Sequence, residues 1–142
     1  MRTIFGVSWV AIIAATLAFY MIGFVIYALV FGDLWLELVG MSQADAIARS
    51  EELGAMMYIW GLLITFIQVL GLAWVMNHVG ASDIGTSIKV GATIATFIAL
   101  PVLGYSWLHE GRATGVVGID FAHLLIAYST SCAILGYFRG RG

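Results

Sequence analysis

The sequence predicts an all-α membrane protein, a single domain (residues 1–142) in which four transmembrane helices form a bundle. Hydrophobic residues make up 62% of the 142 positions and charged residues only 10%, with a mean hydropathy of +1.02. A soluble domain of this size could not cover so much apolar surface with so few charges. The apolar residues form four continuous runs long enough to cross a bilayer, without the alternation of β-barrel strands.

The first predicted span covers about residues 7–31 and contains no charge. Its apolar run exceeds the core of a signal peptide, which favours a helix that stays in the protein. Small residues recur at helical spacing and suit close packing on another helix; they are Ala11, Ala14, Ala15 and Ala18. Tyr27 and Trp35 lie near its exit, a depth that aromatic rings with a polar edge prefer.

The longest polar connection, residues 32–52, is predicted to contain a short amphipathic helix. Ser42 and Asp45 have the spacing of a capping box, and Asp45 and Arg49 can pair one turn apart. The apolar side of this helix could rest on the membrane surface, but we favour a solvated helical connector.

The second predicted span covers about residues 53–76, and Gln68 is its only strongly polar side chain. An amide at this depth usually faces another helix, where it finds a hydrogen-bond partner. Gly80 then permits a tight turn, and Ser82 is the expected N-cap of the next helix.

The third predicted span covers about residues 84–107. Gly91, Ala95 and Ala99 recur every fourth residue, a pattern of small residues that lets helices approach closely. Pro101 removes a backbone hydrogen bond and is expected to kink this helix near its far end.

A charged turn precedes the fourth predicted span, which covers about residues 120–138. Four spans place both termini on one side of the membrane. That side would carry Arg2, Lys89, Arg139 and Arg141, and the other side would carry Arg49 and Arg112. By the positive-inside rule, the N- and C-termini are therefore expected in the cytoplasm.

Several stretches resemble a known family. They are Tyr27-Ala-Leu-Val-Phe31-Gly32-Asp-Leu-Trp35, Gly40-Met-Ser42, Leu108-His-Glu110-Gly111-Arg112 and Ile119-Asp120-Phe-Ala-His123. In order and spacing, nearly the whole chain is similar to the bacterial membrane family called domain of unknown function 1761. The resemblance implies a small four-helix protein of the bacterial cytoplasmic (inner) membrane with no established activity. The family often has Ser-Pro after the tyrosine of the first helix, where this chain has Ala28-Leu29.

Ionisable side chains of the second half collect in residues 108–123, which makes this stretch the best candidate for a ligand or partner site. The candidate residues are Tyr27, Trp35, His109, Glu110, Arg112, Asp120 and His123. Asp120 and His123 share a helix face, because they lie three residues apart. Together with His109 and Glu110 they would form a ligand set that suits zinc. No HExxH or CxxC spacing supports this, so the four are weak metal candidates and no metal site is predicted.

The same residues also have a purely structural interpretation, which we favour. Asp120 at a helix start would cap free amides. Arg112 would hold a lipid phosphate or pair with a nearby carboxylate. His123 would donate a hydrogen bond to a neighbouring helix.

Composition excludes several function classes. The formal net charge is −2 and no run of Lys or Arg is present, which argues against a nucleic-acid partner. The one cysteine, Cys132, cannot form a disulfide within the chain. Phosphate-binding loops and nucleophile motifs are missing from the sequence, so we predict no cofactor and no catalytic residues.

The leading functional interpretation is a non-enzymatic protein of the lipid bilayer that acts through helix packing. It would be a homo-oligomer or an accessory subunit of a membrane complex, with contact faces built on Ala11, Ala15, Gly91, Ala95 and Ala99. The alternative is a carrier or receptor for a small molecule or ion, with an outward-facing polar pocket at the start of the fourth helix. A third is a membrane enzyme or metal protein that uses the acid and histidine cluster.

Overall fold

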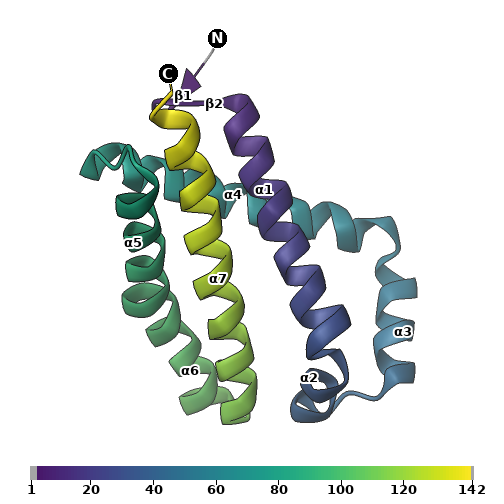
Figure 1. Cartoon of the computed structure of the whole chain (residues 1–142). Coiled ribbons are helices and arrows are strands. Elements are labelled where there is room, and N and C mark those ends of the chain that lie inside the picture. Colours follow the sequence, from purple (N-terminus) through teal and green to yellow (C-terminus); the bar gives the residue numbers. More distant parts are fainter. Residues whose placement is uncertain (1–2, 142) are drawn as a thin grey trace.

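The computed structural model describes residues 3–141, and nearly all of them are helical (Figure 1). In chain order the elements are β1 (Thr3–Ile4), β2 (Val7–Ser8), α1 (Trp9–Phe24), the π-helical turn η1 (Val25–Val30), α2 (Gly32–Val39), α3 (Gln43–Leu53), α4 (Ala55–Val79), α5 (Ile84–Ile94), the π-helical turn η2 (Ala95–Ala99), α6 (Leu100–Glu110) and α7 (Thr114–Arg139). Four helical stretches are long and apolar enough to cross a membrane: Trp9–Val30, Ala55–Val79, Ile84–Glu110 and Thr114–Arg139. The predicted all-α fold class of a membrane protein is therefore confirmed.

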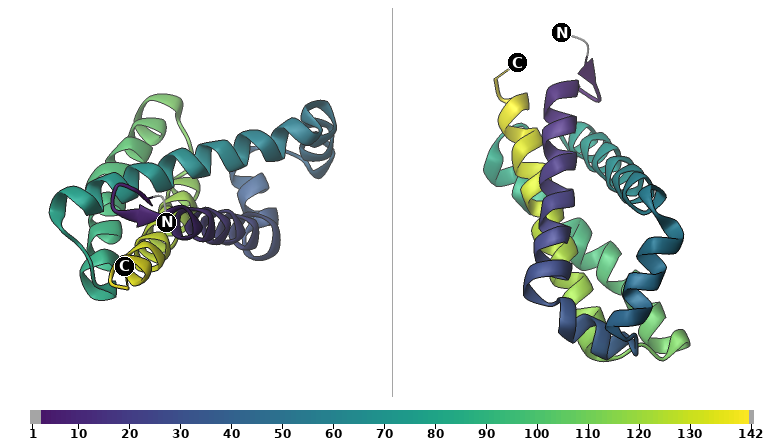
Figure 2. Two further views of the ribbon diagram at one scale, coloured as in Figure 1. Left: turned by 90° about the horizontal axis from the view of Figure 1, so that it is seen from above. Right: turned by 90° about the vertical axis from the view of Figure 1, so that its right-hand side faces the viewer.

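The four long helices are not all aligned. The stretch α1–η1, α7 and the stretch α5–η2–α6 lie side by side, with α7 in the middle (Figure 1). Helix α4 runs obliquely across α1, and its first half projects toward α3 (Figure 2). The two termini lie at one end of the molecule, while α2, α3 and the turn between α6 and α7 lie at the other (Figure 1).

Small residues let α5 and α7 approach closely. A Cβ added to Gly91 would lie 2.5 Å from the carbonyl oxygen of Tyr128, so only glycine fits there. Ala95 and Ala99 are buried on the same helical stretch, with exposed fractions of 0% and 9%. Ala11 and Ala15 of α1 lie in the core and are fully buried. All five residues thus pack helices within the chain.

The third spanning stretch is interrupted where Pro101 follows. The backbone N–H of Leu100 donates to the carbonyl of Ala95, five residues earlier, which closes the π-helical turn η2. Pro101 has no N–H of its own and lies in the first turn of α6. The irregularity that the sequence predicted near Pro101 therefore takes the form of a widened turn just before it.

Helix starts follow local hydrogen bonding, with two differences from expectation. Ser42 and Asp45 form the predicted capping box of α3: the Asp45 N–H donates to Ser42 Oγ at 3.1 Å, and the Ser42 N–H donates to Asp45 Oδ2 at 3.0 Å. At the start of α5 the N-cap is Asp83 rather than Ser82, and its carboxylate accepts from the Thr86 N–H at 2.9 Å.

The second difference concerns the last helix. Helix α7 begins at Thr114, ahead of the expected start near Asp120, and its N-cap position is Ala113. Asp120 therefore lies inside the helix and does not cap free amides as predicted. Further along α7, the hydroxyl of Tyr128 donates to Gln68 Oε1 of α4 at 2.8 Å, which gives the amide the partner expected on another helix.

Candidate functional site

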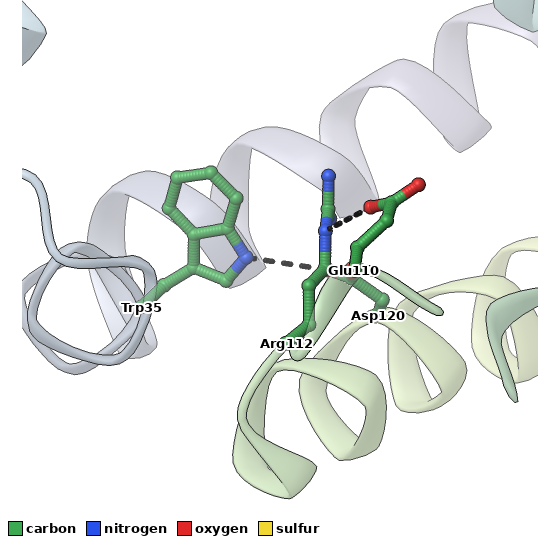
Figure 3. Close-up of polar contacts among 4 residues, drawn as sticks. All are labelled: Trp35, Glu110, Arg112 and Asp120. Atoms are coloured by element: carbon green, nitrogen blue, oxygen red, sulfur yellow. Dashed lines mark hydrogen bonds and ion pairs between the residues drawn. The ribbon is translucent and has the colours of Figure 1, made fainter. Parts of the chain in front are cut away.

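Three elements bring Tyr27, Trp35 and Asp120 together near the end of the molecule opposite the termini. The Tyr27 hydroxyl donates to Asp120 Oδ1 at 2.5 Å. Trp35 Nε1 donates to the same oxygen at 3.3 Å (Figure 3). The residues come from η1, α2 and α7, respectively. Asp120 thus acts as an acceptor that joins three elements.

A local feature of the chain places Tyr27 and Trp35 beside one another. The Phe31 N–H donates to the carbonyl of Ile26 at 2.8 Å, which closes the π-helical turn η1. Gly32 follows, and a Cβ at this position would lie 2.9 Å from the carbonyl oxygen of Tyr27. Because glycine leaves that space free, α2 starts directly after η1 and carries Trp35 back over Tyr27. Their ring centroids are 5.8 Å apart.

His123 lies one turn beyond Asp120 on α7, among aromatic rings. Its ring stands edge-on to Phe19 at 5.6 Å and to Tyr27 at 5.1 Å between centroids. A Cβ added to Gly23 of α1 would lie 3.2 Å from His123 Nε2, so Gly23 makes room for the imidazole. The predicted hydrogen bond from His123 to a neighbouring helix is not formed. Within residues 3–141, Nε2 is buried and has no hydrogen-bond partner.

A cavity of about 820 Å³ lies beside these side chains. It is lined by Tyr27, Ala28, Gly32, Asp33, Trp35, Leu36, Met41, Gln43, Ala46, Arg49, Met57, Leu103, Asp120, His123 and Leu124. Small-molecule sites have volumes of about 300–1,000 Å³ and combine an apolar lining with a few polar groups. By size and by composition, this cavity matches such a site.

Helix α3 forms one wall of the cavity and is only loosely attached. None of its residues is buried. Gly40 and Gly54, which flank it, adopt positive φ angles of 74° and 53°. Its polar contacts differ from the predicted pairing of Asp45 with Arg49, because Asp45 is engaged by Ser42.

The polar side chains on this wall contact one another or α2. Arg49 pairs with Glu52 of the same helix at 3.2 Å. Gln43 Nε2 donates to Asp33 Oδ1 of α2 at 2.7 Å. Arg49 is therefore paired, whereas Asp33 is exposed and is hydrogen-bonded to a neutral amide rather than to a cation.

The remaining predicted site residues lie elsewhere. Arg112 Nε and Glu110 Oε2 pair at 3.1 Å (Figure 3) and line a second cavity of about 330 Å³, which they share with Trp35. His109 is exposed and stacks on Tyr105, with 5.8 Å between ring centroids.

The four weak metal candidates, His109, Glu110, Asp120 and His123, do not come together in one place. In the part of the chain that the structure describes, no three His, Cys, Asp or Glu side chains lie close enough together to hold a metal ion. The candidate set divides into Tyr27, Trp35, Asp120 and His123 at the large cavity, Glu110 and Arg112 at the small one, and His109 apart from both.

Sequence reasoning missed several residues that shape the large cavity. Met57 and Leu103 contribute from α4 and α6, and Arg49 from α3. The amphipathic pattern predicted α3 as a helix but gave no signal for what it would cover. Gly23 was also missed, since its role depends on an imidazole a hundred residues away in the sequence.

Comparison with known proteins gives one match. The model of the family described as "Protein of unknown function (DUF1761)" matches residues 10–136. No curated protein and no solved structure matches the chain.

Proposed function

We propose that this chain, which belongs to the family described as Protein of unknown function (DUF1761), is a membrane receptor or carrier. It would bind a small molecule in the large cavity. The ligand would enter beside Tyr27 and Trp35 and contact Asp120 and His123. In this proposal the polar residues are a binding site rather than helix-packing groups.

The unpartnered Nε2 of His123 carries the proposal. A buried polar atom without a hydrogen bond costs about 1–3 kcal/mol, and proteins rarely keep one unless it has a use. This nitrogen belongs to a residue that lines the 820 Å³ cavity, one turn from a carboxylate that lines the same cavity. Because Nε2 faces Gly23 and is closed to solvent, a ligand or a water would reach it once the imidazole turns toward the cavity, and it would then satisfy a group that the chain leaves unsatisfied.

The packing of the small residues supports binding over assembly. An oligomer or accessory subunit built on the Gly91 and Ala95 face would need that face free, and α7 covers it. What the chain leaves open is the cavity. Association with another protein would have to use the apolar surface that the helices expose. A lipid bilayer is sufficient to cover that surface without a protein partner.

We further propose that the termini lie in the cytoplasm of a bacterium and that the cavity opens toward the opposite face of its inner membrane. The basic residues near the termini support this orientation. A membrane-impermeant maleimide should label a cysteine at Glu51 in intact cells, in a Cys132→Ala background. A cysteine at Arg141 should react only after lysis. The reverse pattern would contradict this orientation.

The binding proposal is tested by identifying what purifies with the protein. Wild type is isolated from native membranes in dodecyl maltoside, and bound small molecules are released and identified by mass spectrometry. We expect one molecule per chain in wild type, and its loss in His123→Leu and in Met57→Trp, which fills the cavity. Glu110→Gln, outside the cavity, is the matched control and should retain it. Equal recovery from all variants, or no bound molecule in wild type, would reject the proposal.

A further inference from the structure

Asp120 is an acidic group without a counter-ion. Its two hydrogen-bond donors, Tyr27 and Trp35, are both neutral. Among residues 3–141 the Lys and Arg ion pairs are Arg49–Glu52 and Arg112–Glu110, and neither involves Asp120. A carboxylate within a membrane-spanning helix is costly unless a cation pairs with it. The cavity therefore contains one half-buried carboxylate, Asp120, that no cation of the described chain pairs with; Asp33, the other carboxylate at the cavity, is exposed to solvent.

Aromatic rings border the same carboxylate. Tyr27 and Trp35 both contact it, and the rings of Tyr27 and His123 lie 5.1 Å apart between centroids. The face of an aromatic ring attracts a cation, and cages of aromatic rings bind quaternary ammonium groups in proteins. Hydrogen-bond donors for an anion are correspondingly few, since Trp35 Nε1 and the Tyr27 hydroxyl are already engaged by Asp120.

The rest of the cavity is suited to a hydrocarbon group. Its apolar lining consists of Ala28, Leu36, Met41, Ala46, Met57, Leu103 and Leu124. The one cationic side chain at this cavity, Arg49, is paired with Glu52 and belongs to the exposed helix α3. A cation at Asp120 would thus meet no unpaired positive charge.

We propose that Asp120, Tyr27 and Trp35 bind the ammonium group of an amphipathic organic cation, whose apolar portion occupies the remainder of the cavity. This inference rests on the proposed function and specifies the class of ligand. The same chemistry occurs in a free alkylammonium compound and in the headgroup of a choline lipid. The experiment separates these two sources.

The test compares two probes with the same chain and opposite charges, hexyltrimethylammonium and hexanesulfonate. Binding to the full-length protein in the uncharged detergent dodecyl maltoside is measured by isothermal titration calorimetry. We expect wild type to bind the cation at least about tenfold more tightly than the anion, as the combined effect of the carboxylate and the rings. This comparison needs no variant, so it stands even if a substitution disturbs folding.

Two matched variants locate the contact. Asp120→Asn keeps the shape of the side chain and removes its charge, and it should weaken binding of hexyltrimethylammonium by at least about tenfold. Asp33→Asn removes the other carboxylate of the cavity, which is already held by Gln43, and should change the affinity less than about twofold. Equal affinity of wild type for both probes, or an unchanged affinity in Asp120→Asn, would overturn the inference.

The source of the ammonium group is decided by competition. The lipid competitors are added as mixed micelles with dodecyl maltoside. Displacement of the probe by dioleoylphosphatidylcholine, but not by dioleoylphosphatidylglycerol, indicates a lipid headgroup; displacement by neither indicates a free amphiphile. Failure of this inference is also distinguishable from failure of the proposed function. If hexanesulfonate binds instead and Met57→Trp abolishes its binding, the cavity binds ligands but the predicted class is wrong.

Discussion

Replacing His123 by Leu should stabilise the ligand-free protein and should abolish binding of the proposed ligand. The imidazole Nε2 is buried without a hydrogen-bond partner, and such a group costs about 1–3 kcal/mol. Leu has a similar volume and no polar atom. It loses the edge contacts with Phe19 and Tyr27, and an aromatic pair is worth about 0.5–1.5 kcal/mol, so these two losses offset most of that gain. The additional burial of an apolar side chain by Leu leaves a net gain in unfolding free energy on the order of 1 kcal/mol.

The chain contains its own reporter for this measurement. Cys132 is the only cysteine and is fully buried, so a thiol-reactive fluorophore reacts with it when the protein unfolds. In dodecyl maltoside, a gain of about 1 kcal/mol corresponds to a rise in Tm of roughly 2–5 °C for a chain of this size. The protein must first be exchanged free of any ligand, because bound ligand would stabilise wild type selectively.

His78→Leu is the matched control. His78 is exposed, and its Nδ1 lies 3.0 Å from the carbonyl oxygen of Trp74, so this imidazole is already satisfied. We expect no rise in Tm for this variant. If His123→Leu lowers Tm by several degrees in the ligand-free protein, the imidazole is a packing residue and the reasoning that treats it as an unsatisfied group is wrong.

Two further predictions concern the scaffold around the site. Gly91→Ala should lower the unfolding free energy by about 1–3 kcal/mol, because the added Cβ would lie 2.5 Å from the carbonyl oxygen of Tyr128 and the backbone cannot give way. The control is Gly118→Ala, whose Cβ would have nothing within 4 Å and which should not lower Tm. Equal Tm values for the two variants would contradict this account of the close approach. Hydrogen bonds from Ser42 hold the pKa of Asp45 below its ordinary value of about 3.9, so the cap should be intact above that value and lost as the pH falls through the lowered pKa. The protection factor of the amides at the start of α3, which is corrected for the pH dependence of intrinsic exchange, should then fall on acidification in wild type but not in Ser42→Ala. A protection factor in wild type that does not depend on pH would refute the assignment.

Local signals in the sequence were sufficient for most of the helical architecture. Continuous apolar runs predicted four spanning helices, because backbone groups in lipid must be satisfied within each segment. The spacing of Ser42 and Asp45 predicted the capping box of α3, since this motif joins residues within one turn. Helix starts were less certain: the apolar run did not reveal that α7 begins at Thr114, ahead of Asp120.

The composition of the candidate site depended on longer-range geometry. Tyr27, Trp35, Asp120 and His123 were all named from sequence, but so was His109, which stacks on Tyr105 instead. Proximity along the chain suggested a single cluster, whereas helix rotation decides which side chains point into the cavity. The turn η1 sets that rotation for Tyr27, and no simple pattern in the sequence predicts a π-helical turn at this position.

By itself, the sequence determined that this chain lies in lipid, that it crosses as four helices, and that its polar residues collect at one end. These properties follow from hydrophobicity and hydrogen bonding within short segments. The tertiary structure decided that the small residues of α1 and α5 are covered within the chain, that α4 leaves α1 obliquely, and that a cavity with an unpaired carboxylate and an unpartnered imidazole results. Such features arise from contacts between residues far apart in the chain, where packing of whole helices outweighs any local preference.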